Sequence, residues 1–239
     1  MAILTRKSDL KLILEDLFQQ YETGGLPLFI DQFDRQLLQQ KVKFPLLEFA
    51  AVSIHSFFDK SLHIHICEEI ATFQTIGGNV VIGILLKERL PQHLNESFSK
   101  AIQFIAQGKE WYVSDIIGER VFGNGVLQFP SQALPLLQQM SAHESQWVVR
   151  SIGAGSHLAT KRGLEEPVAQ EVFQLLLQLG GSTNYQVRRG IGWAAKTMAK
   201  FHPNVIELYR SQLQEEKIGN WFRKKVNIGL ERHRHAQSN

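Results

Sequence analysis

The sequence contains a single cysteine, Cys67, which excludes an internal disulfide and a zinc site built from several thiolates. Its position between Ile66 and Glu68 predicts packing inside a helix rather than a reactive thiol. The chain also lacks any apolar run close to the ~20 residues that cross a bilayer. Residues 1–20 carry charges throughout and have no signal-peptide core. We therefore expect a cytoplasmic protein with no membrane partner.

A second absence concerns strands, because the alternation of apolar and polar residues that indicates a sheet does not occur. Apolar residues recur instead at helical spacing, and this pattern predicts an all-α protein. We expect helices at residues 6–21, 28–40, 46–58, 61–76, 80–90, 94–106, 109–122, 131–141, 145–160, 165–179, 184–201, 203–214 and 219–235.

Glycine, asparagine and proline predict where these helices begin and end. Gly77-Gly78-Asn79 and Gly123-Asn124-Gly125 are expected to interrupt the helices on either side. Ser145 and Asn184 are expected as N-caps, and Pro203 suits the first turn of its helix.

An Ile-Gly dipeptide recurs at a spacing typical of helical repeats. It occurs at Ile82-Gly83, Ile117-Gly118, Ile152-Gly153, Ile191-Gly192 and Ile228-Gly229, at intervals of 35, 35, 39 and 37 residues. A period in this range, with helical patterning inside each unit, predicts a stacked array of two-helix repeats. Glycine costs about 0.5–1 kcal/mol inside a helix, so its repetition indicates close approach between neighbouring helices.

The repeat register places an acid and two arginines at equivalent positions. Two residues before each Ile-Gly pair the chain reads Val80, Asp115, Arg150, Arg189 and Val226. Equivalent positions of a solenoid form a column on one surface, so Asp115 is expected beside both arginines. Trp111 lies four residues before Asp115, and Trp193 lies four residues after Arg189. Residues four apart lie on the same face of a helix. We therefore expect the acid, the two arginines and the two tryptophans to converge.

Charge is distributed unevenly along the chain. Residues 151–239 contain 13 Lys and Arg against 7 Asp and Glu, whereas residues 1–150 contain 13 against 16. This asymmetry favours a polyanionic partner for the C-terminal part. Basic residues interleaved with aromatics suit DNA. The residues expected to bind DNA are Arg150, Lys161, Arg188, Arg189, Lys196, Lys200, Arg223, Lys224 and Lys225.

Each of these features also has a structural explanation. Asp115 is suited to an ion pair with Arg150 or Arg120, and the lysines to a solvated surface. His63 and His65 are two residues apart and share no helix face, so no metal or cofactor is expected. A carboxylate on a DNA-binding surface repels phosphates, and is best explained if it compensates positive charge in a transition state. Cleavage of an N-glycosidic bond develops such charge.

Three motifs resemble those of AlkD-type DNA alkylation repair proteins, which are HEAT-like repeat DNA glycosylases. Trp111-Tyr112-Val113-Ser114-Asp115 resembles their Trp-x-x-x-Asp motif. Trp147-Val148-Val149-Arg150 resembles a helix start with a DNA-facing arginine. The stretch from Gly190-Ile191-Gly192-Trp193 through Lys196 and Lys200 to His202-Pro203 resembles the family's Gly-Trp helix and its final turn. The resemblance covers about residues 45–230.

The resemblance implies a HEAT-like α-α superhelix with a concave DNA-binding cleft, as one domain over residues 1–239. Residues 1–44 would be N-terminal helices of weaker resemblance, and residues 45–235 the repeats. It further implies a monomer that excises cationic N3- or N7-alkylated purines from double-stranded DNA without metal or cofactor. The implied catalytic residues are Trp111 and Trp193 against the deoxyribose, Asp115 stabilising the oxocarbenium ion or positioning water, and Arg150 holding the backbone.

The middle of the first motif departs from the family pattern. Active members often read Trp-Trp-Asp-x-Val-Asp, whereas Tyr112 and Val113 occupy the central positions here. Relatives called AlkF and AlkG share the fold and resemble weak or inactive glycosylases that bind branched DNA. An alternative function is therefore non-catalytic or weakly active binding of branched or damaged DNA. A third hypothesis, a protein-binding solenoid, is disfavoured by the arginine column and the basic charge.

Overall fold

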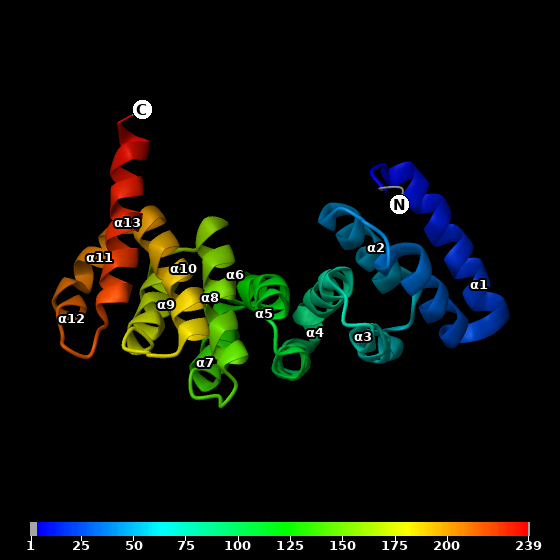
Figure 1. The fold of residues 1–239 in the computed structure, drawn as a ribbon, viewed down its shortest axis with the longest axis horizontal. Helices are drawn as coiled ribbons and strands as arrows, with labels where there is room; N and C mark the ends of the chain where they lie inside the picture. Colours follow the sequence, from blue (N-terminus) through cyan, green and yellow to red (C-terminus); the bar gives the residue numbers. More distant parts are fainter. Residues whose placement is uncertain (1–3, 239) are drawn as a thin grey trace. The chain divides into compact units, whose positions relative to one another are not determined.

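The computed structural model describes residues 4–238, and these residues are almost entirely helical (Figure 1). Within them, extended backbone pairs only at an isolated parallel bridge between Leu4 and Val42. The all-α prediction is therefore confirmed. The chain divides into unit 1, Met1–Lys100, and unit 2, Ala101–Asn239. The organisation of the whole chain as one domain stays a prediction, and each unit is described by itself.

Unit 1 is built from helices whose phenylalanine rings pack together, with Phe18 on Phe57 and Phe29 on Phe58. Its elements are α1 (Lys7–Phe33), the π-helical turn η1 (Asp34–Leu38), α2 (Phe44–Phe57), the 3-10 turn η2 (Lys60–Leu62), α3 (His63–Thr72) and the larger part of α4 (Ile76–Gly108). Gly25, with φ of 68°, kinks α1 where a break is predicted. Cys67 is buried in α3, as expected, and burial raises the pKa of its thiol.

Helix α4 differs from the prediction at its start. Gly77 and Gly78 lie inside its first turn and do not form a loop. Thr75 explains the difference, because its hydroxyl accepts a hydrogen bond from the Gly78 N–H (3.0 Å) and its carbonyl accepts one from the Asn79 side chain (2.8 Å). These bonds satisfy polar groups at the helix start. The helical conformation breaks at His93, inside the gap predicted between the helices at residues 80–90 and 94–106.

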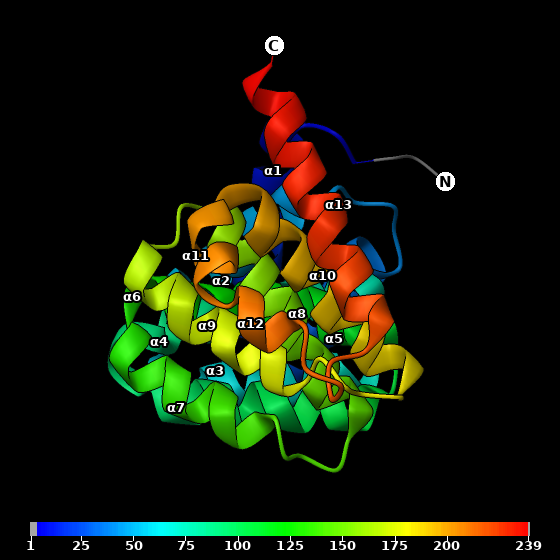
Figure 2. The same cartoon turned by 90° about the vertical axis from the view of Figure 1, so that its left-hand side faces the viewer.

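Unit 2 consists of two layers of helices. Its elements after α4 are α5 (Trp111–Gly118), the π-helical turn η3 (Glu119–Gly123), α6 (Asn124–Gln128), α7 (Pro130–Met140), α8 (Gln146–Lys161), α9 (Glu166–Gln178), α10 (Tyr185–Phe201), α11 (Pro203–Leu208), α12 (Arg210–Leu213) and α13 (Asn220–Gln237). Helix α10 lies between α8 and α13, and α8 also packs against α5 (Figure 1, Figure 2). Helix α9 contacts α7 and α11 in the second layer. This arrangement confirms stacked two-helix repeats in unit 2.

The expected interruption at Gly123-Asn124-Gly125 is wrong, because the backbone stays helical through Gln128. The Asn124 side chain donates to the Arg120 carbonyl (2.7 Å), and a Cβ on Gly123 would lie 2.9 Å from the Gly155 carbonyl oxygen. Asn124 therefore stabilises the helical backbone through its hydrogen bond, and Gly123 allows this backbone to pack tightly against α8. Tertiary contact overrides their usual tendency to end a helix.

Glycines of the repeated dipeptide lie where helices touch. A Cβ on Gly153 would fall 2.2 Å from the carbonyl of Gly190, and one on Gly229 would fall 2.3 Å from the Lys196 carbonyl oxygen. No side chain fits at such distances, so the explanation by close helix approach is confirmed at these positions. The contacts fix α8 against α10 and α10 against α13.

The start of α10 is fixed by its predicted cap. The Asn184 side chain accepts hydrogen bonds from the Gln186 and Val187 N–H groups (2.9 and 3.2 Å). Pro203 occupies the first turn of α11, as predicted. Ser145 occupies the N-cap position of α8, but its side chain makes no capping bond. No helix among the described residues is long and apolar enough to cross a membrane.

Candidate functional site

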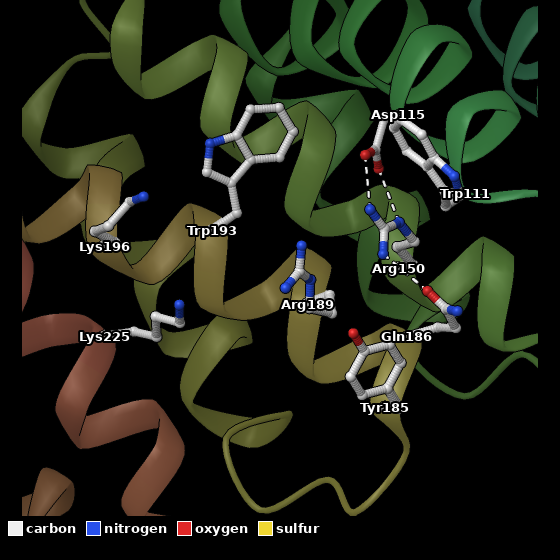
Figure 3. Close-up of a pocket in the computed structure, with 9 residues that line it drawn as sticks. All are labelled: Trp111, Asp115, Arg150, Tyr185, Gln186, Arg189, Trp193, Lys196 and Lys225. Atoms are coloured by element: carbon white, nitrogen blue, oxygen red, sulfur yellow. Dashed lines mark hydrogen bonds and ion pairs between the residues drawn. The ribbon is translucent and has the colours of Figure 1, made fainter.

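An open pocket of about 560 Å³ lies in unit 2, lined by residues of α5, α8, α10 and α13 (Figure 3). Its lining residues are Trp111, Asp115, Arg150, Tyr185, Gln186, Arg189, Trp193, Lys196 and Lys225. The acid, two arginines and two tryptophans that the repeat register predicts to converge therefore do so. Their roles in chemistry stay a prediction.

Asp115 and Arg150 form a two-pronged ion pair at one side of this pocket. Arg150 Nε donates to Asp115 Oδ1 (2.9 Å), and Nη2 donates to Oδ2 (2.7 Å). A third donor, Nη1, reaches the Gln186 side-chain oxygen (2.9 Å). The two charged side chains are only 8% and 14% exposed. Because the planar guanidinium matches a carboxylate, the pair holds Asp115 in one orientation.

Arg150 is more deeply buried than expected for a residue that holds the DNA backbone, because it is only 7% exposed. Its contact with DNA stays a prediction. A Cβ on Gly190 would lie 2.4 Å from the Arg150 carbonyl oxygen, so α10 presses directly on its backbone. The alternative interpretation, an ion pair between Asp115 and Arg150, is confirmed.

Two aromatic side chains in the pocket are largely open to solvent. Trp111 is 54% exposed at the start of α5, and Tyr185 is 65% exposed at the start of α10. Each stands six residues before an Ile-Gly pair, so the two occupy equivalent repeat positions. Exposed aromatic faces beside cations are suited to stacking on bases or sugars.

Sequence reasoning missed Tyr185 and Gln186. A signal for Tyr185 was present, because it lies four residues before Arg189 and therefore shares a face of α10 with Arg189 and Trp193. Gln186 carries no such signal. Its place in the pocket depends on the Arg150 side chain reaching across from α8.

Trp193 is covered on one side by a residue that also escaped prediction. The His157 ring stacks on the Trp193 indole with centroids 3.9 Å apart and planes inclined by 26°. His157 Nδ1 lies 2.7 Å from the Thr197 hydroxyl oxygen. Burial, Lys161 and Lys196 lower the pKa of His157 to about 4.

Positive charge exceeds negative charge in the pocket. Arg189, Lys196 and Lys225 line it, and none of them forms an ion pair with another described residue. Burial and the nearby Arg232 and Lys225 lower the pKa of Lys196. Like charges held this close favour an anionic ligand, and phosphates have the charge and the hydrogen-bond acceptors to fit.

The other residues expected to bind DNA do not line the described pocket. These are Lys161, Arg188, Lys200, Arg223 and Lys224. Arg223 donates to the Leu213 and Glu215 carbonyls, which gives it a structural role at the start of α13. Lys161 and Lys224 are exposed, and DNA contact by them stays a prediction. In the described part of the chain, no group of three or more His, Cys, Asp or Glu could hold a metal ion.

By its fold and its pocket, the molecule is a helical-repeat protein with an open, cation-rich site. Residues 79–217 match the family model described as DNA alkylation repair enzyme. The match covers more than half of the chain, and the chain belongs to this family.

Solved structures from Streptococcus mutans share this fold. AlkD2 aligns with a TM-score of 0.66 at 13% identity, over 85% of this chain and 96% of its own. The protein smu.31 of strain UA159 aligns with a TM-score of 0.60 at 13% identity, over 92% of this chain and 97% of its own. No curated protein matches the sequence. At such identity the likeness shows the AlkD-type helical-repeat fold.

Proposed function

We propose that the protein is a DNA glycosylase that removes cationic N3- or N7-alkylated purines from duplex DNA by hydrolysing the N-glycosidic bond. The observation that carries the proposal is the Asp115 carboxylate, fixed by Arg150 in an open pocket that also contains exposed aromatic rings. Membership of the DNA alkylation repair enzyme family supports it.

The chemistry suits an acid that stays in place. When the bond between C1′ and the base nitrogen breaks, its electron pair neutralises the cationic purine, so the leaving base needs no proton. The deoxyribose left behind has oxocarbenium character, and a preorganised carboxylate stabilises that positive charge. Water then adds to C1′ and loses a proton. Asp115 would supply the negative charge, while Trp111 and Trp193 would line the sugar.

The unpaired cations would hold the backbone around this sugar. Arg189, Lys196 and Lys225 line the same pocket as Asp115 and form no ion pair within residues 4–238. Phosphates on either side of the lesion would balance them, and the carboxylate would then face the one part of the strand that becomes positive. Positioning and charge complementarity are the two effects by which this arrangement would lower the barrier.

A second candidate function, binding of branched or damaged DNA without efficient catalysis, is favoured by the ion pair itself. Arg150 already balances the charge of Asp115 and engages both carboxylate oxygens. Each oxygen keeps a second lone pair, so the pair permits both functions. Assignment to the AlkF/AlkG branch would agree with this second candidate.

Release of methylated base from duplex DNA, compared between wild type and Asp115→Asn, separates the two candidates. The substitution keeps the size of the side chain and removes its charge. Excision should fall by roughly 10²–10³-fold, the effect of losing one preorganised electrostatic group. Affinity for undamaged DNA should hold or rise, because the substitution leaves the positive charge of Arg150 without the carboxylate that balances it.

Glu110→Gln is the matched control, since Glu110 is an exposed acid immediately before α5. It should leave excision unchanged. If the wild type binds DNA but releases no methylated base, the glycosylase proposal fails and the non-catalytic binder becomes the function. Melting curves of both variants show whether a loss of rate is only a loss of folded protein.

A further inference from the structure

His157 reaches Trp193 from a different helix. His157 lies on α8, whereas Trp193 and Thr197 lie one turn apart on α10. The imidazole stacks on the indole (3.9 Å between centroids) and bonds to the Thr197 hydroxyl (2.7 Å). The His157 ring therefore contacts the Trp193 side chain by stacking, and it contacts α10, the helix that carries Trp193, through a hydrogen bond.

The hydrogen bonds determine which imidazole nitrogen carries the proton. The Thr197 hydroxyl donates to the Trp193 carbonyl (3.0 Å), and a hydroxyl has only one hydrogen to donate. His157 Nδ1 must therefore be the donor in its bond to Thr197. The ring plane is thereby fixed relative to the α10 backbone, and the stacked indole is fixed with it.

We propose that His157 is a positioning residue, whose imidazole covers one face of the Trp193 indole and holds the other side of the ring toward the pocket for a nucleotide. Only the identity of the occupant rests on the proposed function. A tryptophan side chain that is already oriented loses less conformational freedom when a ligand binds.

The charge around His157 is consistent with this role. Burial lowers the pKa of His157 to about 4, and Lys161 on α8 and Lys196 on α10 add to this effect because both oppose protonation of the imidazole. The ring therefore remains neutral near pH 7 and adds no further positive charge beside the pocket.

Fluorine NMR of protein labelled with 5-fluorotryptophan tests the inference without requiring activity. Trp193→Phe assigns the Trp193 resonance. His157→Ala should shift or broaden that resonance and leave those of Trp111, Trp147 and Trp221 in place. His157→Phe keeps an aromatic ring in the stack and should restore most of the wild-type line. Thr197→Val replaces the hydroxyl with a methyl group, which cannot accept the hydrogen bond from Nδ1, and should give an intermediate effect.

Excision kinetics provide the second measurement. The indole is proposed to position the bound nucleotide for the reaction, so loss of its orientation should affect the rate more than substrate binding. His157→Ala should therefore lower kcat by roughly 10-fold or more with a smaller change in KM, and His157→Phe should recover most of the lost kcat. A Trp193 resonance unchanged in His157→Ala overturns the inference. If wild type excises nothing, the proposed function fails by itself, and the Trp193 resonance still decides the role of His157.

The pH dependence gives an independent check of the stack. The wild-type Trp193 resonance should stay constant from about pH 8 to about pH 5.5, because the pKa of His157 in the folded protein is about 4. In the unfolded chain the pKa of His157 returns to its ordinary value of 6.5. Below pH 6.5 the unfolded chain therefore binds this proton more readily than the folded protein, so stability should fall as pH drops from about 6.5 toward 4. A shift of the resonance with a midpoint near 6.5 would contradict the buried stack.

Discussion

Arg150 occupies the point where three helices of unit 2 meet. Its side chain extends from α8 to Asp115 on α5 and to Gln186 on α10. Removing two charges from water is costly, and the attraction between them repays this only when the geometry is good. The two-pronged geometry meets that condition. Arg150 is therefore both a support for Asp115 and a connection between neighbouring repeats.

Arg150→Ala should lower the free energy of unfolding by about 3–5 kcal/mol, the usual cost of removing one partner from a buried ion pair. The substitution leaves the Asp115 carboxylate, only 14% exposed, without its cation. Chemical denaturation of the purified protein measures the change.

The control for this measurement is Arg188→Ala, an exposed arginine on α10 that does not line the pocket. Its effect should stay within about 0.5 kcal/mol. A double variant with Asp115→Ala should be less destabilised than the sum of the single changes, because the stranded charge is gone. Equal, small effects of Arg150→Ala and the control would contradict a structural ion pair.

Sequence reasoning at the residue scale identified which side chains meet but not how they point. The register placed Asp115, Arg150 and Arg189 in one column, and all three line the pocket. Whether Arg150 faces solvent or Asp115 depends on rotamers and on the distance between α5 and α8, which no periodicity contains. His157 escaped notice for the same reason, since its partner is on another helix.

Helix α10 contributes more of the pocket than any other element. Tyr185, Arg189 and Trp193 follow one another at four-residue spacing and therefore share one face. The Asn184 cap fixes where this face begins. Gly190 lies against α8 on an adjoining part of the helix. The position of the pocket residues consequently depends on how closely α10 can approach α8.

Gly153→Ala should disrupt this approach. The added methyl group would lie 2.2 Å from the Gly190 carbonyl, so backbone must move to accept it. Overpacking of this kind costs about 1–3 kcal/mol, although alanine by itself favours a helix. Thermal unfolding measures the loss, and DNA affinity should fall with it because α10 carries the pocket residues.

Gln174→Ala, on an exposed face of α9, is the matched control and should change stability by less than about 0.5 kcal/mol. A Gly153→Ala variant as stable as this control would show that the glycine contact is not required.

Element boundaries were predictable where a local signal acts alone, as at Asn184 and Pro203. They were wrong at two sites that combine residues which usually end helices. At Gly77 to Asn79, bonds to Thr75 keep the chain helical, and this local capping signal was missed. At Gly123 to Gly125, packing against α8 keeps the chain helical, and local sequence does not contain that contact. The repeat period predicted the stacked helix pairs because one period spans two whole helices. It therefore depends on how helices pack together and not on the conformation of any single turn.

At the scale of the whole molecule, the excess of positive charge lies in unit 2, which also contains the pocket. Residues 101–239 contain 16 Lys and Arg against 11 Asp and Glu, whereas residues 1–100 contain 10 against 12. The net charge of the protein is only +3, so this excess is local. It favours association of unit 2 with a polyanion at rates that depend on ionic strength.

The salt dependence of DNA affinity should therefore be steep, and it should respond to pocket cations. The logarithm of the binding constant falls with the logarithm of salt concentration by about 0.9 per phosphate neutralised on duplex DNA. Lys196 lines the pocket and has no ion-pair partner in the described part of the chain, so Lys196→Gln should weaken binding and lower this slope by about one. Lys217→Gln is the control, because Lys217 lies 2.7 Å from Glu215 and outside the pocket, and should leave the slope unchanged. Titrations over a range of salt concentrations measure both. Binding that is insensitive to salt, or an equal change in the two variants, would mean that these cations do not contact the DNA backbone.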